Sequence, residues 1–313
     1  MLTPGEKALC EGAARLELCD RARLEAFGED RVRLLHALAT MPIADLDPGE
    51  GTQTFFLSPQ GRIQAFCRLY VMEDRVLLET DPRRRAALQS YLDGYVIMDD
   101  VTLEDRTAAT AAIAVEGPGA RETIARALDG LAPPAEPHAH AADGPWRVFA
   151  SSLSGQDGGW IMTEAERKAE LLERLDRAGA SPASASDLLR VRVSNRIPSF
   201  DEDYFDTNIP HETQQLQWVS FNKGCYVGQE IVERVRSLGQ VNKLLVPLEV
   251  EGAAELTNAE VLFDGRPTGT LTSVVESLEG GARRGFAILR RVAVEAGTDL
   301  LVDGRTARIL PWP

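Results

Sequence analysis

The residues with the clearest chemical potential form one octapeptide, Lys-Gly-Cys-Tyr-Val-Gly-Gln-Glu, at positions 223–230. Cys225 is one of four cysteines in the chain, and Lys223 stands two residues before it. The thiolate is the reactive and metal-binding form of cysteine, and a nearby cation favours it. Gly224 and Gly228 carry no Cβ, so backbone or ligand can come close at these positions. The pattern predicts a functional thiol or, equally well, a buried structural cysteine in a tight turn.

Directly after the octapeptide the sequence predicts an amphipathic helix. Ile231, Val235 and Leu238 recur at helical spacing, and Gly239 is placed to end the helix. Cys225 then lies at or just before the first turn, where unpaired backbone N–H groups and the positive end of the helix dipole favour a thiolate. The sequence therefore predicts a loop that runs into a helix, with an activated cysteine at the junction.

The elements that must position this loop alternate between helices and strands up to about residue 240. The first run, residues 10–39, reads as helical, and Asp81-Pro82 reads as an N-cap with proline at the first helical position. Alternating apolar residues bounded by turn residues predict strands. The expected strands are 52–57, 63–70, 76–80, 101–103, 111–115, 146–152 and 159–163, and further helices are expected at 82–93, 117–128, 164–178 and 186–192.

After Gly239 the pattern changes to short strands with almost no helical signal. Short strands at regular spacing predict a small β-barrel or sandwich, with a domain boundary near residue 241. The length of 313 residues agrees with about two domains. The expected strands are 243–250, 260–263, 268–275, 285–289, 299–302 and 306–310.

The stretch 130–145 is rich in alanine and proline and reads as a linker, at which the first region could divide. It holds His138 and His140, which are spaced for one face of an extended segment. Two histidines could bind a metal, but no third ligand is visible nearby. The expectation is therefore a polar, solvated loop.

Composition narrows the class of protein. The net charge is −14 and the isoelectric point about 4.9, so broad attraction to nucleic acid is not expected. No run of about 18 apolar residues is present, and the N-terminus has no apolar stretch of signal-peptide length. The cysteines form no Cys-x-x-Cys pair, so neither a zinc ribbon nor a disulfide framework is indicated. A reducing, cytoplasmic setting without a membrane span is the simplest expectation.

The octapeptide resembles the signature of the YgfZ family, the folate-binding, iron–sulfur-linked relatives of the glycine-cleavage T-protein. Similarity to that family extends in order and spacing over nearly the whole chain. Arg192 to Pro198 looks like a degraded form of the family's Arg-Glu-Ala-Gly-Ile-Pro stretch. The other matching stretches are 27–31, 57–63, 209–212, 219–221, 233–234 and Gly239.

The resemblance implies a T-protein-like α+β fold, in which antiparallel sheets with helices surround a central folate cleft. Residues 1–240 would form this folate-binding region, with a subdivision near 130–145, and residues 241–313 would form a small C-terminal β-barrel. A folate site needs apolar walls, an acid or amide for the pterin edge, and cations for the tail carboxylates.

The same resemblance implies the site residues. Glu212 would accept hydrogen bonds from the pterin ring, and Arg192 or Arg62 would pair with the tail carboxylates, although a surface salt bridge explains each of the three equally well. Cys225 would be the functional thiol, assisted by Lys223. One thiolate cannot hold a cluster that needs about four ligands, so the thiol would bridge an iron–sulfur cluster shared with a partner or undergo reversible oxidation. Further cofactor contacts are expected from Gly224, Tyr226, Gly228, Gln229 and Glu230.

Two departures from the family pattern bear on activity. In the T-protein the segment after the Gly-x-Ile turn carries adjacent aspartates, one of which is catalytic in aminomethyl transfer, whereas here Ala65 and Phe66 stand there. Neither can take a proton, which argues against aminomethyl transfer. In the other stretch the family's glutamate is missing, with Val193 after the arginine and Arg196 where a glycine is usual. Weak or altered folate binding is therefore expected.

These observations favour a folate-binding accessory factor for the assembly or repair of iron–sulfur proteins, which would support tRNA modification indirectly. Its cofactor would be tetrahydrofolate or a derivative, with a shared iron–sulfur cluster as a second candidate. The expected partners are iron–sulfur enzymes or cluster-assembly proteins, with no direct contact to nucleic acid or membrane. Two alternatives stay open, a folate-dependent aminomethyl transferase and a ligand-free interaction module on the same fold.

Overall fold

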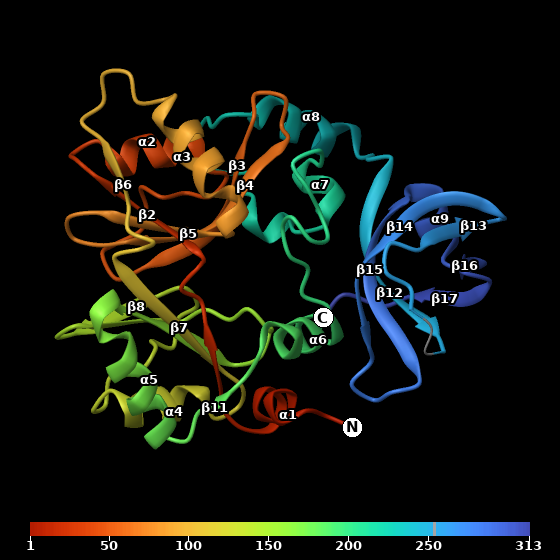
Figure 1. Ribbon diagram of the computed structural model, residues 1–313. Coiled ribbons are helices and arrows are strands. Elements are labelled where there is room, and N and C mark those ends of the chain that lie inside the picture. The colour runs from red at the N-terminus through yellow and green to blue at the C-terminus, as the bar shows by residue number, and fades with distance from the viewer. Residues whose placement is uncertain (253–254) are drawn as a thin grey trace.

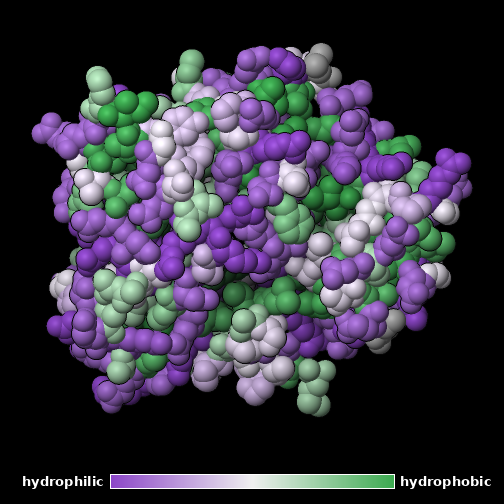
Figure 2. Space-filling model, turned by 45° about the horizontal axis from the view of Figure 1, so that its top comes forward, coloured by the Kyte–Doolittle hydropathy of each residue, from purple (hydrophilic) through white to green (hydrophobic). Residues whose placement is uncertain are grey.

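Three β-structures form the frame of the protein, two sheets and a closed barrel. The computed structural model describes residues 1–252 and 255–313. The two sheets lie one above the other, and the barrel lies beside them (Figure 1). Hydrophilic residues cover most of the face drawn in Figure 2, as expected for a chain in which 26% of residues are charged. The α+β class with a C-terminal barrel, predicted from the sequence, is confirmed.

The five-stranded sheet has the order β3-β4-β5-β2-β6, with antiparallel neighbours throughout. Its strand β4 alternates strictly, so that Ala65, Cys67 and Leu69 pack into the core beneath helices α2 and α3. Phe66 and Arg68 therefore point to the opposite face of the sheet. The bounds are β2 (Ala22–Phe27), β3 (Gly51–Leu57), β4 (Ile63–Val71), β5 (Val76–Thr80), β6 (Thr102–Asp105), α2 (Arg31–Leu38), η1 (Pro82–Arg84) and α3 (Arg85–Asp93).

The six-stranded sheet has the order β11-β1-β7-β10-β9-β8 and is antiparallel except for the short β1–β11 pair. One face packs against α4 and α5 through residues such as Ile113, Ile161 and Leu171. On the other face Phe149 and Trp160 meet Tyr70 of the five-stranded sheet. The bounds are β1 (Ala14–Glu17), β7 (Thr110–Glu116), α4 (Ala120–Ala127), β8 (His140–Asp143), β9 (Trp146–Phe149), β10 (Gly158–Glu164), η2 (Ala165–Arg167), α5 (Lys168–Arg177) and β11 (Ser181–Pro182).

The C-terminal part closes into a barrel with the order β12-β15-β14-β13-β16-β17. All six predicted strands form, and the interior is apolar because alternate residues such as Leu248, Leu271 and Ala287 face it. One short helix, α9, was not expected. The separate folding of this part from about residue 241 stays a prediction. The bounds are β12 (Lys243–Glu251), β13 (Glu260–Phe263), β14 (Arg266–Glu276), β15 (Ala282–Arg290), α9 (Arg291–Ala296), β16 (Leu300–Val302) and β17 (Arg305–Ile309).

An apolar junction joins the barrel to the two sheets. Phe55 of β3, Tyr226 of the octapeptide and Phe286 of the barrel belong to this one buried cluster, together with Phe200 and Tyr204 from the loop after α6. Helices α6, α7 and α8 lie between the sheets and the barrel, η3 contributes residues to the cluster, and α1 packs on α6 (Figure 1). Their bounds are α1 (Pro4–Glu11), α6 (Ala185–Ser194), α7 (Pro210–Thr213), η3 (Leu216–Trp218) and α8 (Gln229–Leu238).

Two segments differ from the sequence-based expectation. The range 10–39, expected to be helical, contains strands β1 and β2 between two helices. Strand β2 is buried on both faces and includes Arg23, whose guanidinium donates to backbone carbonyls, so neither alternation nor polarity marked it as a strand. The expected linker 130–145 contains strand β8, and His140 is buried there because its backbone N–H pairs with Gly49.

The octapeptide also lies differently from the prediction, because α8 begins only at Gln229. Gly228 precedes the helix in the left-handed region, with φ of 83°. A Cβ at Gly228 would lie 2.6 Å from the carbonyl oxygen of Ser58, and a Cβ at Gly61 would lie 2.9 Å from Cβ of Ile231. Cys225 is therefore outside the first turn, and the glycine serves the packing of α8 on the β3–β4 turn.

The two glycines of the octapeptide should consequently respond very differently to alanine. Gly228→Ala should lower the free energy of unfolding by about 2 kcal/mol or more, since it combines a left-handed backbone with a clash against backbone atoms. Gly224→Ala is the matched control, because a Cβ there meets nothing within 4 Å, and should change stability by less than about 0.5 kcal/mol. Urea unfolding measures both, and equal losses would contradict the packing role.

Candidate functional site

Lys223 anchors the octapeptide rather than facing the cysteine. Its ammonium donates to the carbonyl oxygens of Ala39 at 2.6 Å and Met41 at 3.1 Å, and also to that of His36. These carbonyls lie at and just beyond the C-terminal end of α2, where a cation satisfies unpaired acceptors and the helix dipole. Burial lowers the pKa of Lys223 to about 8. The expectation that Lys223 acts on the thiol of Cys225 is not supported by this geometry.

The rest of the octapeptide divides into a buried part and an exposed part. Tyr226 is 6% exposed, its hydroxyl has no hydrogen-bond partner among the described residues, and burial raises its pKa to about 12. Cys225 and Gly224 are exposed, so the alternative of a buried structural cysteine is wrong. Gln229 is half-buried, and Glu230 is exposed and pairs with an arginine one turn later in α8. The octapeptide thus presents its thiol to the surface.

A resident metal cluster does not fit this surface. Within residues 1–252 and 255–313 no group of three or more His, Cys, Asp or Glu side chains is placed to hold a metal ion. Cys225 is a free, exposed thiol. An iron–sulfur cluster needs about four ligands, so any cluster at Cys225 would need ligands from another molecule.

A second group of side chains lies on the face of the five-stranded sheet opposite to helices α2 and α3. We call it the aromatic–polar cluster, and it consists of Gln53, Phe66, Arg68, His138 and Trp218, all partly buried. The ring centroids of Phe66 and Trp218 are 6.4 Å apart, and those of His138 and Trp218 are 5.4 Å apart. Nε2 of Gln53 lies 3.3 Å from Nε2 of His138. Aromatic walls therefore stand beside an amide, an imidazole and a guanidinium.

Burial and ion pairing determine which side chains at this cluster are charged. Arg68 pairs with the buried carboxylate of Glu79 at 2.8 Å, and Arg21 contacts the same carboxylate. Burial alone would raise the pKa of Glu79, but the two arginines outweigh it and hold this pKa below its usual range. Burial, assisted by the charge of Arg68, lowers the pKa of His138 to about 4, so the imidazole is neutral at pH 7. The expected solvated loop at His138 is therefore wrong.

Several buried polar atoms around the cluster lack a hydrogen-bond partner among the described residues. They include Nδ1 of His138 and Nε of Arg68. Within the described residues, Oγ of Ser194 at the end of α6 is a further buried atom without a partner, but no contact joins it to the cluster. Buried polar atoms are almost always satisfied in proteins, so such a concentration is typical of a site that receives a polar ligand.

The cluster and the octapeptide share one supporting segment. The carbonyl oxygen of Trp218 accepts from Oγ1 of Thr40 at 2.7 Å, and the N–H of Ser220 donates to the carbonyl of Thr40 at 2.9 Å. Lys223 binds carbonyls on both sides of the same threonine. A shift of the octapeptide would therefore be transmitted to Trp218 through this short segment.

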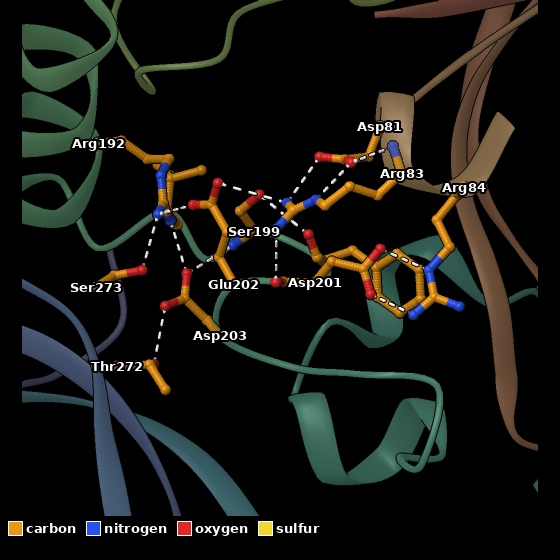
Figure 3. Close-up of polar contacts among 12 residues, drawn as sticks. Asp81, Arg83, Arg84, Arg192, Ser199, Asp201, Glu202, Asp203, Thr272 and Ser273 are labelled. Atoms are coloured by element: carbon orange, nitrogen blue, oxygen red, sulfur yellow. Dashed lines mark hydrogen bonds and ion pairs between the residues drawn. The ribbon is translucent and has the colours of Figure 1, made fainter. Parts of the chain in front are cut away.

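Arg192, which was expected to pair with the tail carboxylates of a folate, uses its guanidinium N–H groups for contacts inside the protein. It is 6% exposed and pairs with Asp203 and Glu202, each at 2.7 Å (Figure 3). It also donates to the carbonyl of Ile197 and to the hydroxyl of Ser273 in the barrel. We therefore correct the expectation: Arg192 is an internal ion-pair partner that ties α6 to the barrel.

The other two residues expected at the folate ends lie nearer the surface. Glu212 accepts from the side chain of Asn208 at 3.0 Å and from the N–H of Ile209 at 3.2 Å, so it caps the short helix α7. Arg62 is exposed and donates to the carbonyl of Thr207. Their expected contacts with folate stay predictions.

The positions that depart from the family pattern face in different directions. Ala65 is fully buried under the helices, whereas Phe66 belongs to the aromatic–polar cluster. Of positions 65 and 66, position 66 is thus the one at which an acid would face a ligand in the aromatic–polar cluster. Val193 is buried in the apolar junction, so a glutamate there would be an unpaired buried charge. Arg196 has a φ of 61°, which glycine adopts freely, so this residue corresponds to the glycine of the family's Arg-Glu-Ala-Gly stretch. The family's glutamate lies two residues before that glycine, and the residue at that position here is Ser194.

Comparisons with known proteins agree with this architecture. The GCVT N-terminal domain family matches residues 6–223, and the CAF17 C-terminal beta-barrel domain family matches residues 242–313. The fold is that of glycine cleavage system aminomethyltransferase T from Bartonella henselae, with a TM-score of 0.88 at 16% identity over 100% of this chain and 90% of that one. The fold and the matches thus define a GCVT-type protein with a CAF17-type barrel.

Sequence relatives narrow the family. The tRNA-modifying protein YgfZ of Yersinia pestis is 27% identical over 85% of this chain and 81% of its own. The aminomethyltransferase of a Nostoc strain is 24% identical, over 97% and 84%. A chloroplastic protein of Arabidopsis thaliana, named as a transferase, is 24% identical, over 94% and 69%. The chain belongs to the YgfZ/CAF17 family, as the octapeptide predicted.

Sequence reasoning did not find most of the aromatic–polar cluster. Gln53, His138 and Trp218 come from segments far apart in the chain, and no local spacing links them. The usable signal was the alternation of β4, which places Phe66 and Arg68 on one face opposite to the apolar residues.

The buried neutral imidazole of His138 predicts a specific dependence of stability on pH. Its pKa falls from the ordinary value near 6.5 to about 4 on folding, so the unfolded chain binds the proton more tightly. The contribution is complete above pH 6.5 and is lost as the pH falls toward 4. Wild type should lose about 1–3 kcal/mol more than His138→Gln between pH 7 and pH 4.

Urea unfolding of the two proteins across this pH range measures the difference. Other titrating groups act in both proteins, so the comparison cancels them. Parallel stability curves would show that His138 titrates normally.

Proposed function

We propose that the protein binds a reduced folate in the aromatic–polar cluster and acts as an accessory factor for iron–sulfur proteins. The observation that carries the first part is the concentration of unpartnered buried polar atoms, such as Nδ1 of His138 and Nε of Arg68, beside aromatic rings. The aromatic–polar cluster suits a flat heterocycle, because such a ligand needs apolar walls and a few directed hydrogen bonds. Membership in the YgfZ/CAF17 family supports the same ligand.

Each side chain of the cluster has a defined part in this proposal. Phe66 and Trp218 supply apolar walls for a pterin, and Gln53 supplies an amide that donates or accepts. The neutral His138 offers one donor and one acceptor, which suits a pterin edge better than an imidazolium would. Arg62 is the remaining candidate cation for the tail carboxylates.

The second part of the proposal rests on Cys225. The thiol is exposed at the tip of a loop whose lysine and tyrosine are fixed from behind. Such a thiol can reach a partner protein, and it could supply one ligand to a cluster that the partner completes. One relative is named a tRNA-modifying protein, which agrees with support of an iron–sulfur enzyme that acts on tRNA.

Aminomethyl transfer is the second candidate, suggested by the names of other relatives. The position where an acid would face the ligand is Phe66, which cannot take a proton. The nearest buried carboxylate, Glu79, is paired with Arg21 and Arg68, which stabilise its charged form. We therefore place this activity second, and an interaction module without ligand third.

The proposed compartment is the cytoplasm, where thiols stay reduced. A chloroplastic relative shows that this family is not confined to one compartment. In the part of the chain that the structure describes, no helix is both long and apolar enough to cross a membrane.

Calorimetric titration with tetrahydrofolate tests the ligand. Wild type should bind, and Trp218→Ala should weaken binding by about tenfold or more because one wall is removed. The matched control is Trp312→Ala, whose ring stacks on Phe286 at the barrel and should leave binding unchanged. Absence of heat at millimolar tetrahydrofolate in wild type would reject folate binding and favour the interaction module.

Cys225→Ala tests the thiol in a strain that lacks the protein. The variant should fold normally, since removing an exposed sulfur creates little cavity, but it should fail to restore the activity of iron–sulfur enzymes. Cys19→Ala, at a partly buried cysteine, is the control and should restore it. In the purified protein Cys225 should alkylate faster than the other cysteines, and most clearly faster than buried Cys67, whose thiol pKa is raised by burial.

Full restoration by Cys225→Ala would rule out the thiol role while leaving folate binding intact. The two halves of the proposal therefore fail independently.

A further inference from the structure

A separate pocket of about 400 Å³ is lined by residues of both sheets. The strands β2, β6 and β8, which carry part of its lining, lie on the side of the sheets away from the barrel (Figure 1). The walls of the pocket come from the ends of β2, β6 and β10 and from the hairpin of β8 and β9. It shares no residue with the aromatic–polar cluster or the octapeptide. Three arginines line it, Arg75, Arg106 and Arg147, and this arrangement is unusual in a chain with a net charge of −14.

Arg147 is a partly buried cation without a carboxylate partner. Its guanidinium donates to Nδ1 of His140 at 2.9 Å, and Nε2 of His140 in turn donates to the carbonyl of Val71 at 2.8 Å. This chain of bonds fixes the imidazole as neutral, with Nδ1 as an acceptor. No Asp or Glu of the described residues lies within ion-pair distance of Arg147. Burial, followed by repulsion from Arg75, lowers its pKa.

The other two arginines are held by one buried carboxylate. Glu25 is 5% exposed and lies 3.0 Å from Nε of Arg75 and 4.0 Å from Nε of Arg106. Neither Nε atom makes a hydrogen bond with the described part of the chain, and neither does buried Oγ1 of Thr163. Glu25 thus compensates both cations in part, and Arg75 also donates through Nη1 to Asp74 at 2.8 Å. The hydroxyl of Thr163 stays without a hydrogen-bond partner in the described part of the chain.

The uncompensated charge in the pocket is that of Arg147, because the other two arginines have carboxylate partners. Arg75 pairs with Glu25 and with Asp74, and Arg106 lies 4.0 Å from Glu25 and 3.6 Å from Glu164. The two remaining carboxylates that line the pocket, Glu104 and Glu164, are exposed and screened by solvent. An anion entering the pocket would therefore compensate the charge of Arg147.

We infer that this pocket is a binding site for a small organic anion that carries a carboxylate or a phosphate group. Arg147 holds a planar fork of donors, of which His140 uses one, and such a fork binds carboxylate and phosphate oxygens in pairs. Arg75, just before β5, and Arg106, just after β6, also line the pocket, and Thr163 adds a hydroxyl. The volume lies within the usual range for small-molecule sites.

Calorimetric titration of the full-length protein with inorganic phosphate and with succinate tests the inference. We expect saturable binding of at least one probe, and the tighter probe identifies the anion class. Arg147→Gln keeps an amide that can donate to His140 and should weaken binding by about tenfold or more. Arg75→Gln is a second variant from another segment and should weaken it in the same direction. Glu164→Gln should tighten binding, since it removes a competing rim carboxylate.

Arg177→Gln is the matched control, because it removes the same charge from an exposed arginine of α5 paired with Glu173. It should leave both titrations within about twofold of wild type. Equal weakening by Arg177→Gln would show attraction by net charge alone and overturn the site. Absence of saturable binding of both probes at 10 mM (about ten times a weak millimolar Kd) would overturn it as well. Circular dichroism verifies that each variant is folded. If Arg147→Gln is unfolded, the titration of Arg75→Gln tests the site in its place.

Discussion

The buried ion pair between Arg192 and Asp203 is the constraint on which the arrangement of the parts depends. Asp203 is 1% exposed and accepts hydrogen bonds from Arg192, from the N–H of Ser199 and from the hydroxyl of Thr272 in the barrel. Removing one partner of a buried pair leaves an uncompensated charge, at a cost of several kcal/mol. Helix α6, the loop after it and strand β14 are therefore held in one relative position (Figure 3).

That position has consequences on both sides of the junction. The same loop carries Phe200 and Tyr204 into the apolar cluster that also contains Tyr226. Tyr226 and Lys223 anchor the octapeptide on its buried side, so that the thiol of Cys225 and the adjacent Gly224 are left at the surface. The ion pair thus fixes segments that support the aromatic–polar cluster and the exposed thiol of Cys225, although it contacts neither of them.

Three arginines, two of them buried and one partly buried, compensate their charge in three different ways. Arg23 donates to backbone carbonyls and threonine, and Arg192 pairs with carboxylates. Arg147 has only the neutral imidazole of His140. The first two are complete inside the protein and are structural, whereas the third leaves donors for a ligand. At the aromatic–polar cluster Phe66 supplies an aromatic ring, whereas the carboxylate of Glu79 is held in its charged form by Arg21 and Arg68.

The sequence by itself determined most of the elements and the family. Alternation placed β4, the regular spacing of short strands placed the barrel, and the octapeptide indicated the YgfZ relationship. Only the tertiary structure decided that Lys223 turns to α2, that Arg192 is paired, and that His138 meets Trp218. Periodicity reports which side of an element is apolar, because that depends on neighbours a few residues away. The partner of a polar side chain comes from a distant segment, and local spacing carries no information about it.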